Sequence, residues 1–221
     1  MDSKINEMRA RIAEIGALMY DRRLTDAAGG NISARVDDVI CLSPRYSGQR
    51  HRWQLKPEDV LVVDMQGNKL DGAGDISRES KAHFTLYREF GEAGSAVIHA
   101  HARNVLVFCA MGRPIPMVLE QTLKFGEVPV VEYAPAHSQQ LADNIVGALR
   151  GHEDRIRKQA AAAIAPWHGL FVMGKDLDMA YDAVERIDGN AYIVLMSQLF
   201  CLPDALEEQR EALVTAMASF K

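Results

Sequence analysis

The chain of 221 residues is long enough for one large domain or two small ones, and its hydrophobic content of 48% supports a sizeable buried core. The formal net charge of −5 is mild and both signs are spread along the chain, which argues against a nucleic-acid-binding surface. The sequence has no run of 18 apolar residues and no signal-peptide core at its start, so we expect no membrane span and no export.

The cysteines are odd in number and far apart: Cys41, Cys109 and Cys201. This pattern fits the reduced thiols of a cytoplasmic protein better than a disulfide framework. No linker rich in proline, glycine or serine divides the chain, and it contains no internal repeat. We therefore predict a single domain over residues 1–221.

Apolar periodicity predicts helices and strands that alternate irregularly along the chain. In the first half of the chain we expect a helix over residues 5–19, strands over 32–36, 39–43 and 60–64, a turn at 67–68, a helix that begins near 77 and a strand over 95–100. In the second half we expect a helical run over 104–111, a helix capped by Ser138, an apolar segment over 160–165, a strand over 170–173, a helix over 177–191 and a last helix beyond Pro203. The hairpins predict an α/β protein whose sheet is largely antiparallel and covered by helices.

The candidate catalytic residues begin at Ser77, which suits a helix N-cap and places Glu79 in the first helical turn. His99 and His101 follow two residues apart near the end of a strand, so their side chains point to the same face. His168 supplies a third imidazole far downstream. Three imidazoles with an open position are typical of catalytic zinc. The alternative is that the histidines only pack and that Glu79 only stabilises a helix terminus.

Two segments could bind an anion such as phosphate. Gly29 and Gly30 before Asn31 permit positive φ angles and close approach of a ligand to backbone N–H groups. Ser77 and Arg78 lie at a predicted helix N-terminus, where free N–H groups suit a phosphate oxyanion. Taken alone, the glycine pair would favour an ordinary tight turn into a strand.

In four motifs the chain resembles the class II aldolase and adducin head domain family, which includes L-fuculose-1-phosphate aldolase. The motifs are GGNIS at residues 29–33, SRE at 77–79, HAH at 99–101 and WHG at 167–169, in the order in which the family has them. The resemblance covers residues 5–200 and implies a three-layer αβα domain. It also implies a homotetramer with each metal site near a subunit boundary.

The resemblance further implies a zinc-dependent aldolase that cleaves a ketose 1-phosphate into dihydroxyacetone phosphate and an aldehyde through a metal-stabilised enediolate. Mn²⁺, Fe²⁺ or Co²⁺ could take the place of zinc. Glu79 would be the general acid and base. The metal ligands would be His99, His101 and His168. The sugar phosphate would be held by Gly30, Asn31, Ser77, Arg78 and Ser43. Extra residues separate Ser43 from Ser47 in the family's Ser-Pro-Ser-Gly turn, and of these two serines Ser43 is favoured.

Several positions depart from the family pattern. Thr122 stands near the catalytic acid of the epimerases and dehydratases, Gln121 near an aldolase tyrosine, and no tyrosine follows Tyr192. The segment around Lys124 resembles the sugar-acid phosphate decarboxylases. The alternatives are therefore a decarboxylase in which Arg78 or Lys124 holds the acid, a 4-epimerase or dehydratase, and a non-catalytic adducin-like interaction domain, which would purify without metal.

Overall fold

The protein, seen in a computed structural model, is described over residues 3–200 and 205–218. Its centre is a seven-stranded sheet in the order β4-β3-β2-β1-β5-β7-β6, and each pair of neighbours is antiparallel. The predicted fold class is confirmed. The strands are β1 (Asn31–Val36), β2 (Val39–Leu42), β3 (Leu61–Asp64), β4 (Lys69–Asp71), β5 (Ala96–Ala100), β6 (Ala160–Ala165) and β7 (Gly169–Gly174).

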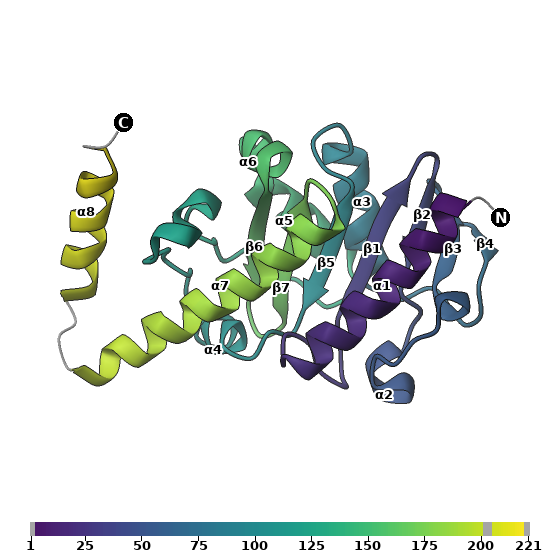
Figure 1. Cartoon of the computed structure of the whole chain (residues 1–221), viewed down its shortest axis with the longest axis horizontal. Helices are drawn as coiled ribbons and strands as arrows, with labels where there is room; N and C mark the ends of the chain where they lie inside the picture. Colours follow the sequence, from purple (N-terminus) through teal and green to yellow (C-terminus); the bar gives the residue numbers. More distant parts are fainter. Residues whose placement is uncertain (1–2, 201–204, 219–221) are drawn as a thin grey trace.

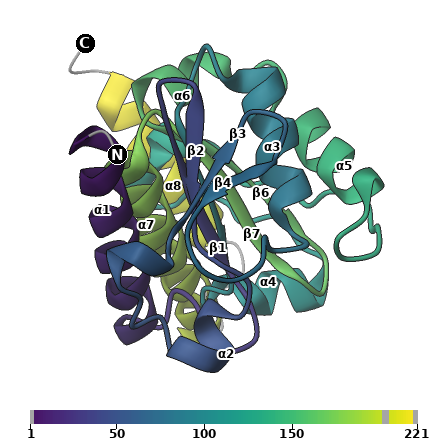
Figure 2. The ribbon, with the colours of Figure 1, turned by 90° about the vertical axis from the view of Figure 1, so that its right-hand side faces the viewer.

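Helices cover both faces of this sheet (Figures 1 and 2). The α-helices are α1 (Ser3–Asp21), α2 (Ser47–His51), α3 (Ser80–Phe90), α4 (Val105–Met111), α5 (Gln139–Leu149), α6 (Glu153–Lys158), α7 (Leu177–Ser197) and α8 (Ala205–Ala218), with 3-10 turns η1 (Pro57–Asp59), η2 (Glu120–Phe125) and η3 (Gln198–Phe200). One hydrophobic core joins α1, α4 and α7 to the sheet, and a second core joins α3, α5 and α6 to the opposite face.

The alternation of side chains along β5 decides on which face of the sheet the candidate site residue His99 lies. On β5, Ile98 packs in the core under α1 and α7, whereas Val97 packs in the core under α3 and α5. Successive side chains on a strand point to opposite faces, so His99 lies on the same face as Val97. There its ring stacks on Phe171 of β7, with centroids 4.2 Å apart.

The helix predicted to begin at Ser77 begins instead at Ser80. The Ser77 Oγ accepts a hydrogen bond from the Glu79 N–H at 3.3 Å, and the Ser80 N–H bonds to the Ser77 carbonyl. Serine at this position therefore closes a turn before the helix, because its hydroxyl competes for backbone N–H groups. As a result, Glu79 lies on the turn that enters α3.

The cap predicted at Ser138 is confirmed, because its Oγ accepts a hydrogen bond from the Leu141 N–H at 3.1 Å at the start of α5. The last predicted helix corresponds to α8, which lies away from the layered body in Figure 1. Pro203 and Cys201 fall outside the described residues. The prediction of a single domain over residues 1–221 stays a prediction.

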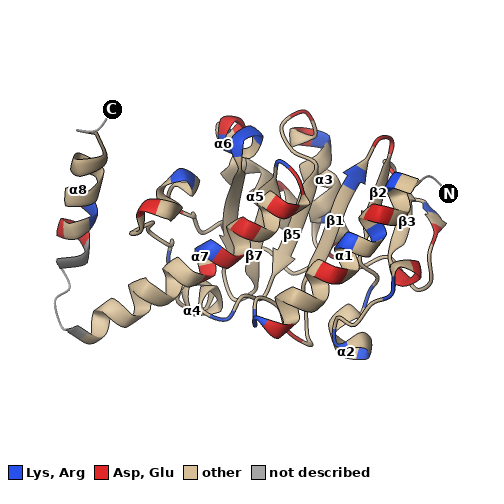
Figure 3. Cartoon of the chain, viewed as in Figure 1, with Lys and Arg blue, Asp and Glu red and all other residues tan. Residues whose placement is uncertain are grey.

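Figure 3 colours the basic and acidic residues on the ribbon, and both kinds are scattered along the helices without a long basic stretch. Within residues 3–200 and 205–218, none of the helices combines the length and the apolar character that crossing a bilayer requires. Cys41 and Cys109 are buried free thiols. Burial raises the pKa of the Cys41 thiol to about 11, so this group is protonated and unreactive at neutral pH.

Candidate active site

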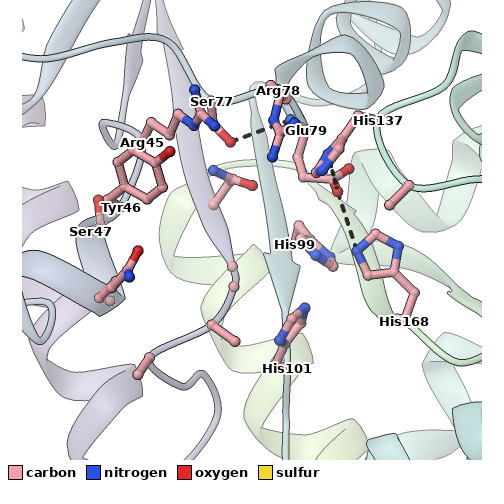
Figure 4. Close-up of a pocket in the computed structure, with 18 residues that line it drawn as sticks. Arg45, Tyr46, Ser47, Ser77, Arg78, Glu79, His99, His101, His137 and His168 are labelled. Atoms are coloured by element: carbon pink, nitrogen blue, oxygen red, sulfur yellow. Dashed lines mark hydrogen bonds and ion pairs between the residues drawn. The ribbon is translucent and has the colours of Figure 1, made fainter.

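Three histidines converge where two neighbouring strands meet. His99 is on β5, His101 lies just beyond its end, and His168 lies in the hairpin that leads into the adjacent strand β7. One nitrogen from each ring falls within 4.8 Å of the others. Figure 4 shows the rings facing a common space. The antiparallel pairing of β5 with β7 therefore brings together residues that are about seventy positions apart in the chain.

In two of these rings, the Nδ1 atom has a polar partner that orients the ring. His99 Nδ1 lies 3.0 Å from the Leu170 carbonyl oxygen, and His101 Nδ1 lies 3.2 Å from a carboxylate oxygen of Asp26. Both Nε2 atoms are buried and have no hydrogen-bond partner among the described residues. A buried, unpaired imidazole nitrogen is costly, and a metal ion would satisfy it. The cluster therefore fits a metal site on its own chemistry.

Burial and neighbouring charges keep His99 neutral. Burial lowers its pKa well below the usual value, and nearby His168 and His101 lower it further. Metal ligation requires a neutral imidazole, so this environment favours the form of the ring that binds metal.

Two glycines provide the space that the rings occupy. A Cβ built on Gly29 would overlap the imidazole of His101. A Cβ on Gly169 would lie 2.7 Å from the Ala100 carbonyl oxygen and 3.0 Å from a His99 ring carbon. A side chain at either position would push the rings apart, so only glycine lets the backbone pass this close to the imidazoles.

The carboxylate of Glu79 lies over this cluster. Its Oε1 is 3.3 Å from His168 Nε2 and 2.7 Å from His137 Nδ1. Burial acts to raise the pKa of Glu79, but the His168 contact and the charges of His168, His137 and His83 act the other way, and the net pKa is lowered. Glu79 is therefore a buried carboxylate that stays ionised at neutral pH.

A pocket opens above the histidines and Glu79 (Figure 4). Of the five residues predicted to hold phosphate, Gly30, Asn31, Ser77 and Arg78 line this pocket. Ser43 does not, because it is fully buried and its Oγ accepts a hydrogen bond from the Ile32 N–H at 3.0 Å. Arg45, Tyr46 and Ser47 line the wall opposite the histidines (Figure 4), and Gly48 and Gln49 also line the pocket.

Residues 10–195 match the family model described as Class II Aldolase and Adducin N-terminal domain. The chain belongs to this family. It is 28% identical over 172 residues to L-fuculose phosphate aldolase of Methanococcus maripaludis, which covers 77% of this chain and 86% of the relative. It is equally 28% identical, over 196 residues, to methylthioribulose-1-phosphate dehydratase of Pseudomonas savastanoi pv. phaseolicola, with 82% of this chain and 91% of the relative covered.

The fold of this class II aldolase family member matches solved structures. A structure of L-fuculose 1-phosphate aldolase superposes with a TM-score of 0.78 at 24% identity, over 96% of this chain and 97% of the other. Members of the family are typically metal-dependent, and the histidine cluster described above could hold the ion.

Another histidine of this family member lies beneath Glu79, away from the three-histidine cluster. His83, on α3, is fully buried, and its Nδ1 lies 2.7 Å from the Ser33 hydroxyl, which also contacts the Tyr87 hydroxyl at 2.8 Å. Burial lowers its pKa to about 3, although the nearby charge of Glu79 acts to raise it. His83 is therefore neutral and packs under Glu79.

The segment that departs from the family pattern does not line this pocket. Thr122 is buried and bonds to Asn190 at 2.9 Å, while the Lys124 ammonium lies 3.6 Å from an Asp182 carboxylate. These contacts join η2 to α7. Within the described chain, Lys124 therefore has a structural partner away from the histidines.

The sequence motifs missed two residues of the site. Asp26 orients His101, and His137 contacts Glu79. Asp26 precedes the glycine pair by three residues, so its position next to that motif was a signal. His137 belongs to no recognisable motif, and only the packing of its loop brings it to the site. Ser47 belongs to the same motif as Ser43, and the structure shows that Ser47 and not Ser43 lines the pocket.

Proposed function

We propose that this protein is a metal-dependent aldolase that cleaves a ketose 1-phosphate into dihydroxyacetone phosphate and an aldehyde. The observation that carries the proposal is the ionised carboxylate of Glu79, held over three histidines at the floor of a pocket. A base next to a Lewis-acid site is what carbon–carbon cleavage beside a carbonyl group requires.

His99, His101 and His168 would hold the metal, and we propose Zn²⁺ because neutral imidazoles with an open position suit it. When bound, the ion would stabilise negative charge on the oxygens of the substrate. Mn²⁺, Fe²⁺ and Co²⁺ also accept imidazole ligands, so metal analysis of the purified protein would decide the identity.

Glu79 would move the proton in this reaction. In the condensation direction its carboxylate removes a proton from the hydroxymethyl carbon of dihydroxyacetone phosphate. In the cleavage direction the hydroxyl group on the carbon that becomes the aldehyde loses its proton as the carbon–carbon bond breaks, and Glu79 in its protonated form delivers a proton to the hydroxymethyl carbon, so that one proton is lost and one is gained. The lowered pKa of Glu79 supports the role of base, because the group is already ionised at neutral pH.

The opposite wall of the pocket would anchor the phosphate. Arg78 and Arg45 supply positive charge there, and Gly30 and Asn31 bring backbone N–H groups to the same space. We replace Ser43 with Ser47 in this role, because Ser47 lines the pocket. Anchoring the phosphate converts binding energy remote from the reacting bond into positioning of that bond.

The test is a cleavage assay on metal-loaded protein with a panel of ketose 1-phosphates, including L-fuculose, L-rhamnulose, ribulose, xylulose and 5-deoxy or 5-thio sugars. Dihydroxyacetone phosphate would be detected with a coupled reductase. We expect cleavage that a chelator abolishes and added metal restores.

The same panel separates the alternatives. Loss of water from the 5-thio sugar without dihydroxyacetone phosphate would indicate a dehydratase, and CO₂ release from a 3-oxo sugar-acid phosphate would indicate a decarboxylase. The pairing of Lys124 with Asp182 weakens the decarboxylase proposal, because this lysine was a candidate to hold the acid. A protein that purifies without metal and turns over none of these compounds would be an interaction domain.

We also propose a homotetramer located in the cytoplasm. Exposed apolar side chains near the site, in the C-terminal part of α7 and in η3 support association: Tyr133, Trp167, Tyr192, Met196 and Leu199. The free buried thiols Cys41 and Cys109 suit a reducing compartment. Light scattering of the purified protein would measure its mass directly.

A further inference from the structure

The backbone at His137 adopts a conformation that histidine seldom adopts. Its φ is +68°, in the left-handed region, where glycine is favoured. The residue is confined between a turn and a helix cap, because the Ser138 N–H bonds to the Pro135 carbonyl and the Ser138 Oγ accepts from the Leu141 N–H. A non-glycine residue held in this region is strained, and such strain is concentrated at functional sites.

The side chain of His137 uses this conformation to reach Glu79. Its Nδ1 lies 2.7 Å from the Glu79 Oε1, which is a close contact between polar atoms. Within the described chain, this nitrogen makes no hydrogen bond of good angular geometry. Figure 4 shows the ring beside the carboxylate and next to the pocket. The contact links the loop before α5 to the turn before α3, two segments that are distant in sequence.

His168 is the other imidazole within reach of the same oxygen, at 3.3 Å from Nε2. A nitrogen that ligates a metal carries no proton, so it cannot donate a hydrogen bond to a carboxylate. When His168 gives this nitrogen to a metal, the 2.7 Å contact between His137 Nδ1 and Glu79 Oε1 remains. His137 itself lies outside the histidine cluster that can hold an ion.

We propose that His137 is a positioning residue that holds the Glu79 carboxylate in the orientation needed for proton transfer. The role as catalyst assigned to Glu79 rests on the proposed aldolase function, whereas the contact between the two side chains does not. The backbone of His137 is strained because an imidazole side chain stands at a position whose left-handed conformation glycine would adopt without strain.

The experiment compares His137→Gly and His137→Asn with wild type and with Asp37→Gly. Glycine removes the ring and suits the left-handed backbone, so the variant should fold with an unchanged or higher melting temperature. Asparagine tolerates this backbone and places an amide near the position of Nδ1. Asp37→Gly is the matched control, because Asp37 also has a positive φ, of +49°, but is exposed and lies in a hairpin far from the pocket.

For the metal-loaded enzymes we expect His137→Gly to lower kcat roughly ten- to a hundredfold with little change in KM and full metal content. His137→Asn should recover most of that loss, and Asp37→Gly should match wild type. A kcat within twofold of wild type in His137→Gly would overturn the proposal. So would a raised KM at unchanged kcat, which would make His137 a substrate-binding group.

A second measurement needs no turnover. In the wild-type protein and in Glu79→Gln, the ring resonances of His137 are identified by NMR from their loss in His137→Asn. We expect these resonances to shift when the carboxylate becomes an amide. If they do not shift, the contact is absent and the proposal fails. If they shift while no ketose phosphate is cleaved, the aldolase proposal fails and the His137–Glu79 contact stands.

Discussion

At the scale of single residues, the site depends on what surrounds each histidine. His99 is oriented by a backbone carbonyl and His101 by the carboxylate of Asp26, so in both rings Nε2 is the nitrogen left without a partner. Partners of this kind set the tautomer and ring orientation of metal-binding histidines. Gly29 leaves the space into which the His101 ring fits.

Replacing Glu79 with glutamine tests the acid–base role at constant shape. The amide cannot carry the proton, so we expect turnover of the ketose phosphate to fall by roughly two to four orders of magnitude. The three histidines are unchanged, so metal content should stay at the wild-type level. Steady-state kinetics with elemental analysis of the same sample measures both, and near-normal turnover would remove Glu79 from the chemistry.

Gly29→Ala tests the space beside His101. The added methyl group would overlap the imidazole, so the ring must move and metal affinity should fall, roughly ten- to a hundredfold. Competition with a metal-binding dye measures the affinity. Gly147→Ala on α5 is a suitable control, because nothing lies within 4 Å of the Cβ it would introduce. Equal metal affinity in the two variants would contradict this account of Gly29.

At the scale of elements, the site is built where strands end and helices begin. The three histidines come from the end of β5 and the hairpin before β7, and Glu79 comes from the turn before α3. The sheet holds the first group rigidly, because β5 and β7 pair over five positions, from Ala96↔Gly174 to Ala100↔Leu170. The loops before α3 and α5 hold the carboxylate and its partner.

Ser138→Ala tests how the cap of α5 supports this arrangement. Loss of the Oγ acceptor leaves the Leu141 N–H unpaired, so we expect the free energy of unfolding to fall by about 1 kcal/mol. Denaturant unfolding measures the change. Ser138→Asp keeps an acceptor at the cap and should retain most of the stability; a loss as large as that in Ser138→Ala would show that the serine acts in another way.

At the scale of the whole molecule, the sheet separates two cores, and His83 and His99 are buried on the face covered by α3 and α5. The buried, neutral His83 links folding to pH. Its pKa is about 3 in the folded protein against an ordinary value of 6.5, mainly because burial disfavours the charged ring. Below the ordinary value, the unfolded chain therefore binds a proton that the folded chain does not bind.

The stability that His83 contributes is complete above pH 6.5 and is lost as the pH falls toward 3. In metal-free protein we expect the free energy of unfolding to decrease on acidification through this window, with up to about 1.4 kcal/mol per pH unit from this one residue. His83→Asn keeps a partner for Ser33 and should reduce the slope. Urea unfolding at several pH values measures it, and an unchanged slope would contradict the linkage.

The sequence by itself determined most of the elements and two members of the histidine cluster, because these follow from local periodicity. The i, i+2 spacing of His99 and His101 places two rings on one face of any strand, and the apolar patterns predicted α1, β5, α5 and α7 close to their observed bounds. The family motifs added His168 and Glu79 to the same site, although they are far apart in the chain.

Only the tertiary structure decided which further side chains reach the site. Ser43 and Ser47 were both candidates in the sequence, and both are buried. Ser43 Oγ accepts a hydrogen bond from the Ile32 N–H of β1, whereas Ser47, whose Oγ donates to the Pro44 carbonyl, lines the pocket. His137 reaches Glu79 because α3 packs beside α5 and because its backbone is held at positive φ. Contacts between loops depend on the packing of distant elements, and no periodicity within a loop records that packing.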